Sequence, residues 1–257
     1  MSLSDAELER YARQIVLREI GGVGQRRLQA ARVAVVGAGG IGSAVIPALA
    51  GAGVGRLTII DDDVVEASNL HRQLIFREDQ IGAGKAHAAA AFARALNGAI
   101  EVNAAPERIG PDNAEALFAG HDLIVDGSDN FATRLAVNEA AVRLKIPLVS
   151  AAAAQFQGQL ALLRGWEDGQ PCYRCFVGDA FDAEDCDNCA EQGVLGALTG
   201  AVGHLAALLA IQALVGTAGA FAGKLFLIDG WLLKLRPIGI PEDSHCITCG
   251  GNPAPRP

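Results

Sequence analysis

Four glycines follow an apolar run near the start of the chain, within the sequence VAVVGAGGIGSAV at residues 33–45. The spacing of Gly37, Gly39 and Gly42 before a helical stretch is typical of a dinucleotide-binding turn, where backbone N–H groups and a helix N-terminus approach phosphate. A second apolar run ends at Asp61, where such folds place the acid that binds ribose hydroxyls. The pattern predicts a nucleotide site. NAD is its usual ligand, but ATP carries phosphates too.

Polar clusters follow the ends of three predicted strands, where open α/β sheets bind ligands. The clusters supply a hydrogen-bond acceptor for ribose, two cations for phosphates and a carboxylate for magnesium. Nucleotidyl transfer needs all of these groups, whereas a dehydrogenase needs fewer cations. Separately, Arg72 and Lys85 could be solvated surface charges, and Ser128–Asn130 could be a turn that caps a helix. The residues concerned are Asp61, Asp63, Asn69, Arg72, Lys85, Asp129 and Asn130.

All six cysteines lie in three CxxC pairs, at 172 and 175, at 186 and 189, and at 246 and 249. Two such pairs supply the four thiolates of a closed tetrahedral zinc site. By spacing alone, the first pair could meet either the second or the last. The pair at 186 and 189 lies in a stretch with six carboxylates and no Lys or Arg at residues 178–191, a field that raises a thiol pKa and disfavours a nucleophile.

Apolar runs alternate with helical stretches along the first half of the chain. The runs RVAVVG, RLTIID, IEVNAAPERI, DLIVDGSDN and IPLVSAAAA, with helices expected over residues 80–96 and 133–144, predict a Rossmann-like, mostly parallel α/β sheet with helices on both faces. QLALLR, KLFLIDG and LLKLRPI predict additional C-terminal strands, some of them antiparallel.

One domain over residues 1–257 is expected from the length. Its predicted parts are an N-terminal helix at 4–20, begun by a Ser4–Glu7 capping box, a nucleotide-binding half at 32–150, a crossover loop at 165–192 and a C-terminal part at 193–250.

The composition bears on which partners the protein binds and on its location in the cell. A net charge of −8 without long runs of one sign argues against nucleic acid or anionic lipid. The N-terminus lacks the basic and apolar regions of an export signal, so a cytoplasmic location is expected. Residues 193–216 are long and apolar enough to span a bilayer, but Gly, Ala, His204 and Gln212 favour a helix buried inside the domain or between subunits, and no membrane partner is expected.

The order of motifs along the chain resembles the adenylating enzymes of the ubiquitin-activating superfamily. The resemblance extends over nearly the whole chain and is strongest to the bacterial molybdopterin-synthase adenylyltransferase and its thiamine-pathway counterpart. The motifs are RYARQ at 10–14, GAGGIG at 37–42, AGVG at 52–55, DDDVVEASNLHRQ at 61–73, GAGKA at 82–86, DGSDN at 126–130, PCYRC at 171–175 and HCITCG at 245–250.

This resemblance implies ATP as substrate, Mg²⁺ at Asp129 and a structural Zn²⁺. The nucleotide-binding residues would be Gly37, Gly39, Gly40, Gly42, Asp61, Asp63, Ser68, Asn69, Arg72, Lys85, Asp129 and Asn130, and the zinc ligands Cys172, Cys175, Cys246 and Cys249. The catalytic residues would be Arg13, Arg72, Lys85, Asp129 and the loop cysteine Cys189, although the additional Cys186 and the acidic loop depart from the family pattern.

The activity implied is adenylation of the C-terminal Gly-Gly carboxylate of a ubiquitin-like sulfur-carrier protein, with release of pyrophosphate and later transfer of sulfur from a donor protein. The resemblance also implies a homodimer in which Arg13 reaches the neighbouring subunit's ATP. Three alternatives stay open: adenylation of a peptide or a tRNA nucleoside by the same site, an NAD-dependent oxidoreductase, and a non-catalytic scaffold.

Overall fold

The computed structural model describes residues 3–178 and 193–250 and is built on one eight-stranded sheet, with the order β3-β2-β1-β4-β5-β6-β7-β8. The first five strands in this order are parallel, and β6, β7 and β8 are antiparallel additions. The predicted sheet is therefore confirmed, with its C-terminal strands. The strands are β1 (Arg32–Val36), β2 (Arg56–Ile60), β3 (Glu101–Ala105), β4 (Leu123–Asp126), β5 (Leu148–Ala154), β6 (Gln157–Leu163), β7 (Lys224–Asp229) and β8 (Lys234–Gly239).

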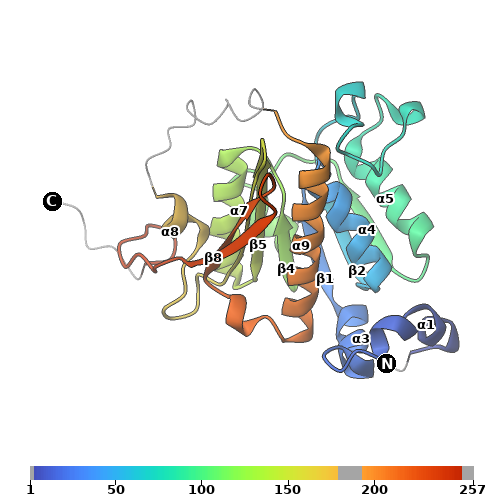
Figure 1. The fold of residues 1–257 in the computed structure, drawn as a ribbon, viewed down its shortest axis with the longest axis horizontal. Helices are drawn as coiled ribbons and strands as arrows, with labels where there is room; N and C mark the ends of the chain where they lie inside the picture. Colours follow the sequence, from blue (N-terminus) through green and yellow to red (C-terminus); the bar gives the residue numbers. More distant parts are fainter. Residues whose placement is uncertain (1–2, 179–192, 251–257) are drawn as a thin grey trace.

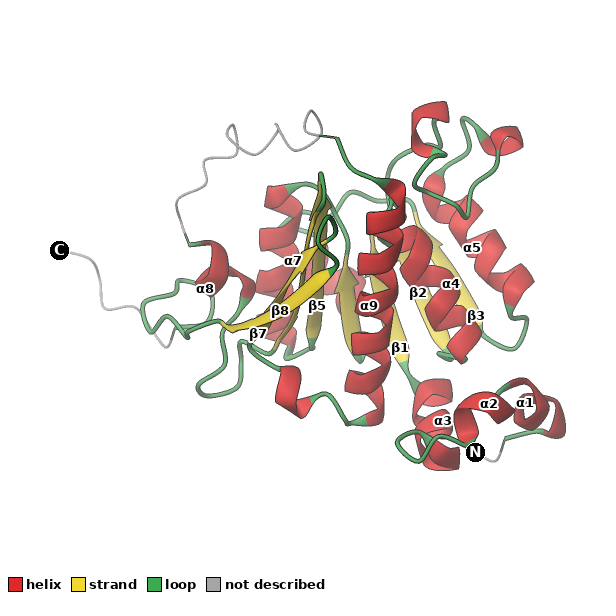
Figure 2. Cartoon of the chain, in the orientation of Figure 1, coloured by secondary structure: helices red, strands yellow, loops and turns green. Residues whose placement is uncertain are grey.

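Helices cover both faces of this sheet (Figure 2). The helices α4 (Gly42–Ala52), α5 (Lys85–Leu96) and α9 (Gly196–Val215) pack on one face, and α6 (Ala114–Phe118) and α7 (Phe131–Leu144) on the other. Because side chains alternate along a strand, β1 serves both cores: Val33 and Val35 belong to the first, and Ala34 and Val36 to the second. Burial on both faces explains why β1 and β4 are continuous apolar runs.

The N-terminal segment differs from the single helix expected over residues 4–20. It forms α1 (Asp5–Arg10) and α2 (Ala12–Ile15), and a further helix, α3 (Gly21–Ala30), precedes β1. The Ser4–Glu7 capping box is present, but the helix is interrupted at Tyr11, which is only 3% exposed. The Tyr11 ring lies over Gly53, and its hydroxyl accepts a hydrogen bond of 2.8 Å from Asn97. Anchoring Tyr11 in the core thus breaks the helix.

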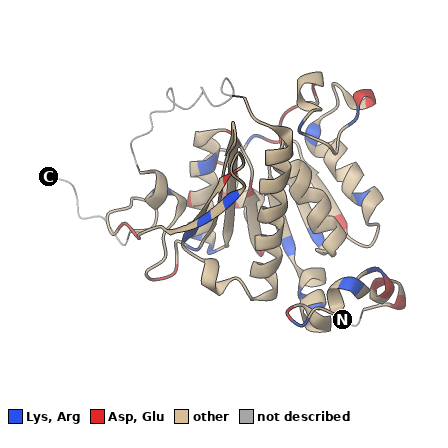
Figure 3. Cartoon of the chain, viewed as in Figure 1, with Lys and Arg blue, Asp and Glu red and all other residues tan. Residues whose placement is uncertain are grey.

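The apolar segment after residue 193 forms α9, which lies across the sheet and packs on α4, β5 and β6. By length and composition α9 could cross a membrane, but half of its most apolar 18-residue segment is buried inside the protein. Figure 3 shows no charged position along it. Its outer side, with Ala201, His204 and Leu208, is exposed in the single chain. The expectation of a helix buried all round is therefore not met within one subunit.

The remaining elements are short. The helix predicted over residues 80–96 begins only at Lys85, after η2 (Glu78–Gln80), and η1 (Ala67–Asn69) precedes it. The helix predicted over 133–144 begins at Phe131. The predicted crossover loop contains α8 (Tyr173–Val177), while its residues 179–192 lie outside the described part of the chain, and η5 (Gly219–Phe221) leads into β7.

Candidate functional site

The glycine turn between β1 and α4 has the conformation that its spacing predicts. Gly37 has φ of +84°, a left-handed value that favours glycine. A Cβ on Gly42 would lie 2.0 Å from the Gly37 carbonyl oxygen, so only glycine allows the helix to start this close to the strand. A Cβ on Gly40 would meet Thr199 of α9 at 3.0 Å, whereas one on Gly39 would meet only Gln73, at 3.8 Å. The turn thus leaves a helix N-terminus open to an anion.

Asp61 lies at the end of β2, directly beside this turn. Its carboxylate accepts hydrogen bonds from the backbone N–H groups of Ala38, at 2.7 Å, and Asp63, at 2.9 Å. Burial raises the pKa of Asp61, and the two N–H groups and the charge of Lys85 oppose that rise. The backbone therefore fixes the carboxylate at the position where a Rossmann-like site binds a ribose.

Lys85 is the first residue of α5 and is only 6% exposed. Residues 63–65 pair with residues 82–85 through backbone hydrogen bonds, which bring its side chain under the end of β2. Its ammonium donates to Asp63 at 2.9 Å, and the Asp63 side chain is 68% exposed. Asp63, expected at the nucleotide, is thus the counter-ion of Lys85 in this structure.

The turn at residues 66–73 carries the second cation. Asn69 is buried and accepts a hydrogen bond from the Glu66 N–H at 3.3 Å, while the Ser68 hydroxyl donates to the Glu66 carboxylate at 3.2 Å. Arg72 donates to the Ser68 carbonyl at 3.0 Å, and within the described chain it has no carboxylate partner. Among the described residues, no acid therefore neutralises the positive charge of Arg72.

The loop after β4 completes the arrangement. Asp126 is buried and accepts from the N–H and the hydroxyl of Ser128, at 2.9 and 2.7 Å. Asp129 is exposed, and Asn130 caps α7 by accepting from the Thr133 N–H at 3.0 Å. The capping interpretation therefore holds for Asn130, while the Asp129 carboxylate faces solvent and offers oxygen atoms of the kind that Mg²⁺ prefers as ligands.

These loops touch one another at the carboxyl ends of β1, β2 and β4. A Cβ on Gly37 would meet the Gly127 carbonyl oxygen at 3.2 Å, which joins the glycine turn to the loop after β4. Gly196, at the start of α9, packs against the backbone of His71 and Arg72. The structure therefore brings together an open helix N-terminus, the anchored carboxylate of Asp61 and two cations.

Arg13 is not part of this assembly within the single chain. It is exposed on α2, which connects α1 to α3, and Figure 1 shows α1 and α3 beyond the opposite end of the sheet. The neighbouring Gln14 donates to the Ala52 carbonyl at the C-terminus of α4, at 3.3 Å. Since an 11-residue helix is about 16 Å long, Arg13 lies roughly that far from the glycine turn at the other end of α4.

Two residues of the site were not predicted from the sequence. Gln73 is 2% exposed, its side chain lies against Gly39, and its Oε1 has no hydrogen-bond partner in the described chain. Thr199 packs on Gly40 and donates to the Gly196 carbonyl at 2.8 Å. Thr199 could have been suspected as a polar residue within an apolar helix, but no spacing rule identifies Gln73.

Four cysteines form a separate cluster, in which the first and last CxxC pairs meet. Their sulfur atoms all lie within 4.8 Å of one another. The distance from Cys172 to Cys246 is 3.6 Å, from Cys172 to Cys175 3.9 Å and from Cys175 to Cys249 3.3 Å. Sulfurs around zinc with bonds of about 2.3 Å are about 3.8 Å apart in a tetrahedron, so this donor set fits Zn²⁺.

The surroundings of the cluster also suit a cation. Burial raises the pKa of Cys172 to about 11, so thiolates would need a positive ion to stay charged here. Asn138 of α7 donates to the Cys172 sulfur at 3.5 Å and accepts from the Tyr173 N–H at 2.8 Å, which orients the first pair. Cys186 and Cys189 lie outside the described residues.

The chain has clear relatives. Residues 11–248 match the ThiF family. The sulfur carrier protein adenylyltransferase of Thermus thermophilus is 42% identical over 261 residues, covering 100% of this chain and 96% of that protein. The SAMP-activating enzyme E1 of Haloferax volcanii is 41% identical over 250 residues, covering 97% of this chain and 92% of that protein.

Other relatives are longer. The adenylyltransferase and sulfurtransferase MOCS3 of Aedes aegypti is 42% identical over 253 residues, and the chain spans 57% of its length. Among solved structures, the crystal structure of E. coli MccB with MccA-N7isoASN superimposes with a TM-score of 0.83 at 22% identity, over 97% of this chain and 76% of that one. At this identity the likeness establishes the common fold.

Proposed function

The chain belongs to the ThiF family, and we propose that it is an adenylyltransferase that activates the C-terminal glycine carboxylate of a ubiquitin-like sulfur-carrier protein with ATP. One observation carries the proposal: the open N-terminus of α4, the anchored Asp61 and the two cations meet at one edge of the sheet. This is a site for a nucleotide with several phosphates rather than for a hydride carrier.

The reaction joins two anions. A carboxylate oxygen of the carrier attacks the α-phosphorus of ATP, the bond from that phosphorus to the bridging oxygen breaks, and pyrophosphate leaves with the electron pair. Arg72 and Lys85 offset the repulsion and stabilise the charge on the leaving group. Mg²⁺, which Asp129 would hold, supplies further positive charge to the phosphates. The product is an acyl-adenylate, from which a donor protein can displace AMP with sulfur.

Asp61 and the glycine turn orient the nucleotide rather than change its bonds. The Asp61 carboxylate, fixed by Ala38 and Asp63, binds the ribose hydroxyls, while the N–H groups at the start of α4 bind phosphate oxygens. Fixed reactants avoid an entropic cost at the transition state. Cys172, Cys175, Cys246 and Cys249 would hold Zn²⁺ in a site closed to substrate, where it would connect α8 to the C-terminal segment.

An exposed apolar hairpin supports a protein as the second substrate. Trp231 is 73% exposed and Leu233 90%, at the turn between β7 and β8, and Trp231 packs edge-on against Phe156. Leu233 also has a left-handed φ of +52°, a strained conformation for leucine. Monomeric surfaces seldom keep such groups exposed without a binding role.

The hairpin is continuous with the nucleotide site. A Cβ on Gly230 would lie 2.8 Å from Leu198 in the first turn of α9, and the next residue, Thr199, packs on Gly40. A carrier on the hairpin would therefore need only a short extended tail to reach ATP. A tail of glycines, which have no side chains, suits such a path.

We expect Leu233→Asn to raise the carrier KM about tenfold and to leave ATP affinity unchanged, because burying a leucine contributes about 1.5 kcal/mol or more. Asparagine tolerates the left-handed backbone, so the hairpin should keep its shape. Leu96→Ala, another exposed leucine at the far end of α5, is the control. An unchanged KM for Leu233→Asn would place the carrier elsewhere.

The activity itself is tested by isotope exchange between pyrophosphate and ATP. Exchange should require Mg²⁺ and a carrier that ends in a free glycine carboxylate, because that carboxylate is the nucleophile. A carrier lacking its last glycine should give only background exchange. Full exchange with the shortened carrier would reject a protein carboxylate as substrate, and NAD binding without any exchange would favour an oxidoreductase.

A further inference from the structure

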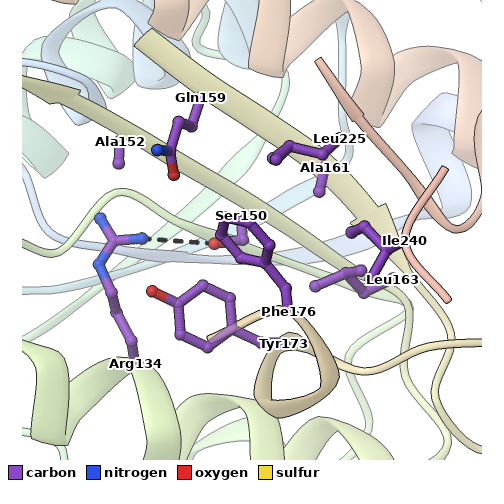
Figure 4. A pocket seen from close by; sticks show the side chains of 10 residues that line it. All are labelled: Arg134, Ser150, Ala152, Gln159, Ala161, Leu163, Tyr173, Phe176, Leu225 and Ile240. Atoms are coloured by element: carbon purple, nitrogen blue, oxygen red, sulfur yellow. Dashed lines mark hydrogen bonds between the residues drawn. The ribbon is translucent and has the colours of Figure 1, made fainter. Parts of the chain in front are cut away.

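Arg134 is a buried arginine on α7 that the reaction above does not use. It is only 7% exposed, and its guanidinium has no acidic partner among the residues that the structure describes. Figure 4 shows it reaching from α7 towards β5, at the edge of a small pocket that Tyr173 and Gln159 also line. Arginine is rarely buried without an acid, so its neutral partners need an explanation.

Those partners lie in the middle of β5 and in the loop that follows β4. The guanidinium donates to the Ala151 carbonyl at 2.8 Å and to the Ser150 hydroxyl at 3.3 Å, both on β5. It also donates to the carbonyl of Ser128, in the loop after β4. The planar guanidinium has five N–H donors in a fixed arrangement, which holds the three acceptors in place more rigidly than the flexible ammonium of lysine would.

The loop after β4 is therefore held from two sides. The buried Asp126 accepts from the N–H and the hydroxyl of Ser128, and Arg134 donates to the carbonyl of the same residue. The next residue is Asp129, whose side chain is exposed. Asn130 then begins α7, the helix that carries Arg134 one turn later. Fixing the peptide at Ser128 fixes the backbone from which the Asp129 carboxylate projects.

We propose that Arg134 is a positioning residue, which holds the loop at residues 127–130 so that Asp129 can bind the magnesium of Mg·ATP. The inference rests on the proposed function, because it assigns Asp129 to the nucleotide's metal. Arg134 touches neither substrate nor metal, and it acts through the Ser128 carbonyl. Residues that orient a metal ligand contribute about 10- to 100-fold to metal affinity.

The test measures ATP binding by calorimetry, with Mg²⁺ and with EDTA, on the intact protein. Wild type should bind ATP more tightly with Mg²⁺ than with EDTA, and this increase in affinity is called the magnesium gain below. Arg134→Met should reduce this gain about tenfold or abolish it, while its ATP affinity in EDTA stays within about threefold. Arg134→Lys keeps the positive charge but lacks the planar guanidinium, so it should reduce the magnesium gain less. This variant also allows the test if Arg134→Met does not fold.

A matched control lies on the same helix. Arg143 is exposed and pairs with Glu115 at 2.8 Å and Glu139 at 2.5 Å, far from the loop, so Arg143→Met should leave the magnesium gain unchanged. Asp129→Asn should itself reduce the gain at least as much as Arg134→Met, while leaving a gain that can still be measured. Because Arg134 acts through Asp129, adding Arg134→Met to Asp129→Asn should reduce the gain no further.

The outcomes separate this inference from the proposed function. If wild type binds Mg·ATP but shows no pyrophosphate exchange with any carrier, the proposed function fails while the magnesium measurement still tests Arg134. If the Arg134 variants melt at lower temperature and keep the full magnesium gain, Arg134 is only a structural residue. A loss of the gain that adds to that of Asp129→Asn would also overturn the proposal, since Arg134 would then act by another route.

Discussion

Cys249→Ser is expected to lose zinc and to lower the melting temperature by roughly 10 °C, the largest stability effect that we expect from a single side chain. A closed site needs all four thiolates, and the sulfurs of Cys172, Cys175, Cys246 and Cys249 are already within 4.8 Å of one another. A ligand at a thousand times its Kd stabilises the folded state by about 4 kcal/mol, which corresponds to this shift in a domain of this size.

The comparison variant is Cys189→Ser, which should keep the metal and the stability. Bound zinc would be counted by elemental analysis, and unfolding would be followed with and without a chelator. Cys189→Ser should also spare pyrophosphate exchange, since an acyl-adenylate forms without a thiol. If Cys249→Ser kept its zinc and Cys189→Ser lost it, the metal would lie between the pairs at 172–175 and 186–189, the arrangement that spacing also allows.

The fold was predictable to the extent that it depends on local patterns. The central strands β1 and β4 are buried and read as apolar runs, whereas β3 and the exposed β8 were predicted from their apolar residues and their place in the alternation of strands and helices. The failure at residues 4–20 has a different cause. Periodicity and the capping box at Ser4 favour one helix, but the long-range contacts of Tyr11 with Gly53 and Asn97 break it, and no local pattern reveals such contacts.

The candidate site was predictable where glycine spacing and strand ends fix the geometry. The glycine turn and Asp61 lie where the motif predicts, and Asn130 is a helix cap. Gln73 and Arg134 were missed because their roles depend on burial against segments distant in sequence. The pairing of the CxxC motifs around zinc likewise depends on the tertiary structure. The spacing within each motif shows only which two cysteines are neighbours in the sequence.

The second large effect concerns Arg13, and it tests whether the site is shared between subunits. We expect Arg13→Ala and Lys85→Ala each to reduce pyrophosphate exchange by about a thousandfold, because an arginine supplied to phosphoryl chemistry can contribute 10³ or more. Arg10→Ala is the control for the N-terminal segment. Arg10 is exposed and donates to the Leu96 carbonyl of its own chain at 3.3 Å, so its replacement should change the rate less than about twofold.

The position of Arg13 makes a role in its own subunit implausible on distance alone. The open N-terminus of α4 and the buried Lys85 are at one end of the sheet, and α2 contacts the other end of α4. We propose that a two-fold dimer brings Arg13 of one subunit to the ATP of its partner. The exposed side of α9, with its small and apolar residues and no charge, is a surface that such a dimer could bury.

Mixing the two inactive variants distinguishes the two arrangements. In a mixed dimer, the Arg13→Ala subunit keeps its own Lys85 and receives Arg13 from its partner, so one of the two sites is complete. Random exchange makes about half of the dimers mixed, so about a quarter of the wild-type exchange rate should return. An arginine acting within its own subunit predicts no recovery, because neither subunit then has both groups. Activity that stays at the level of the separate variants, after mass spectrometry has shown mixed dimers, would reject the shared site.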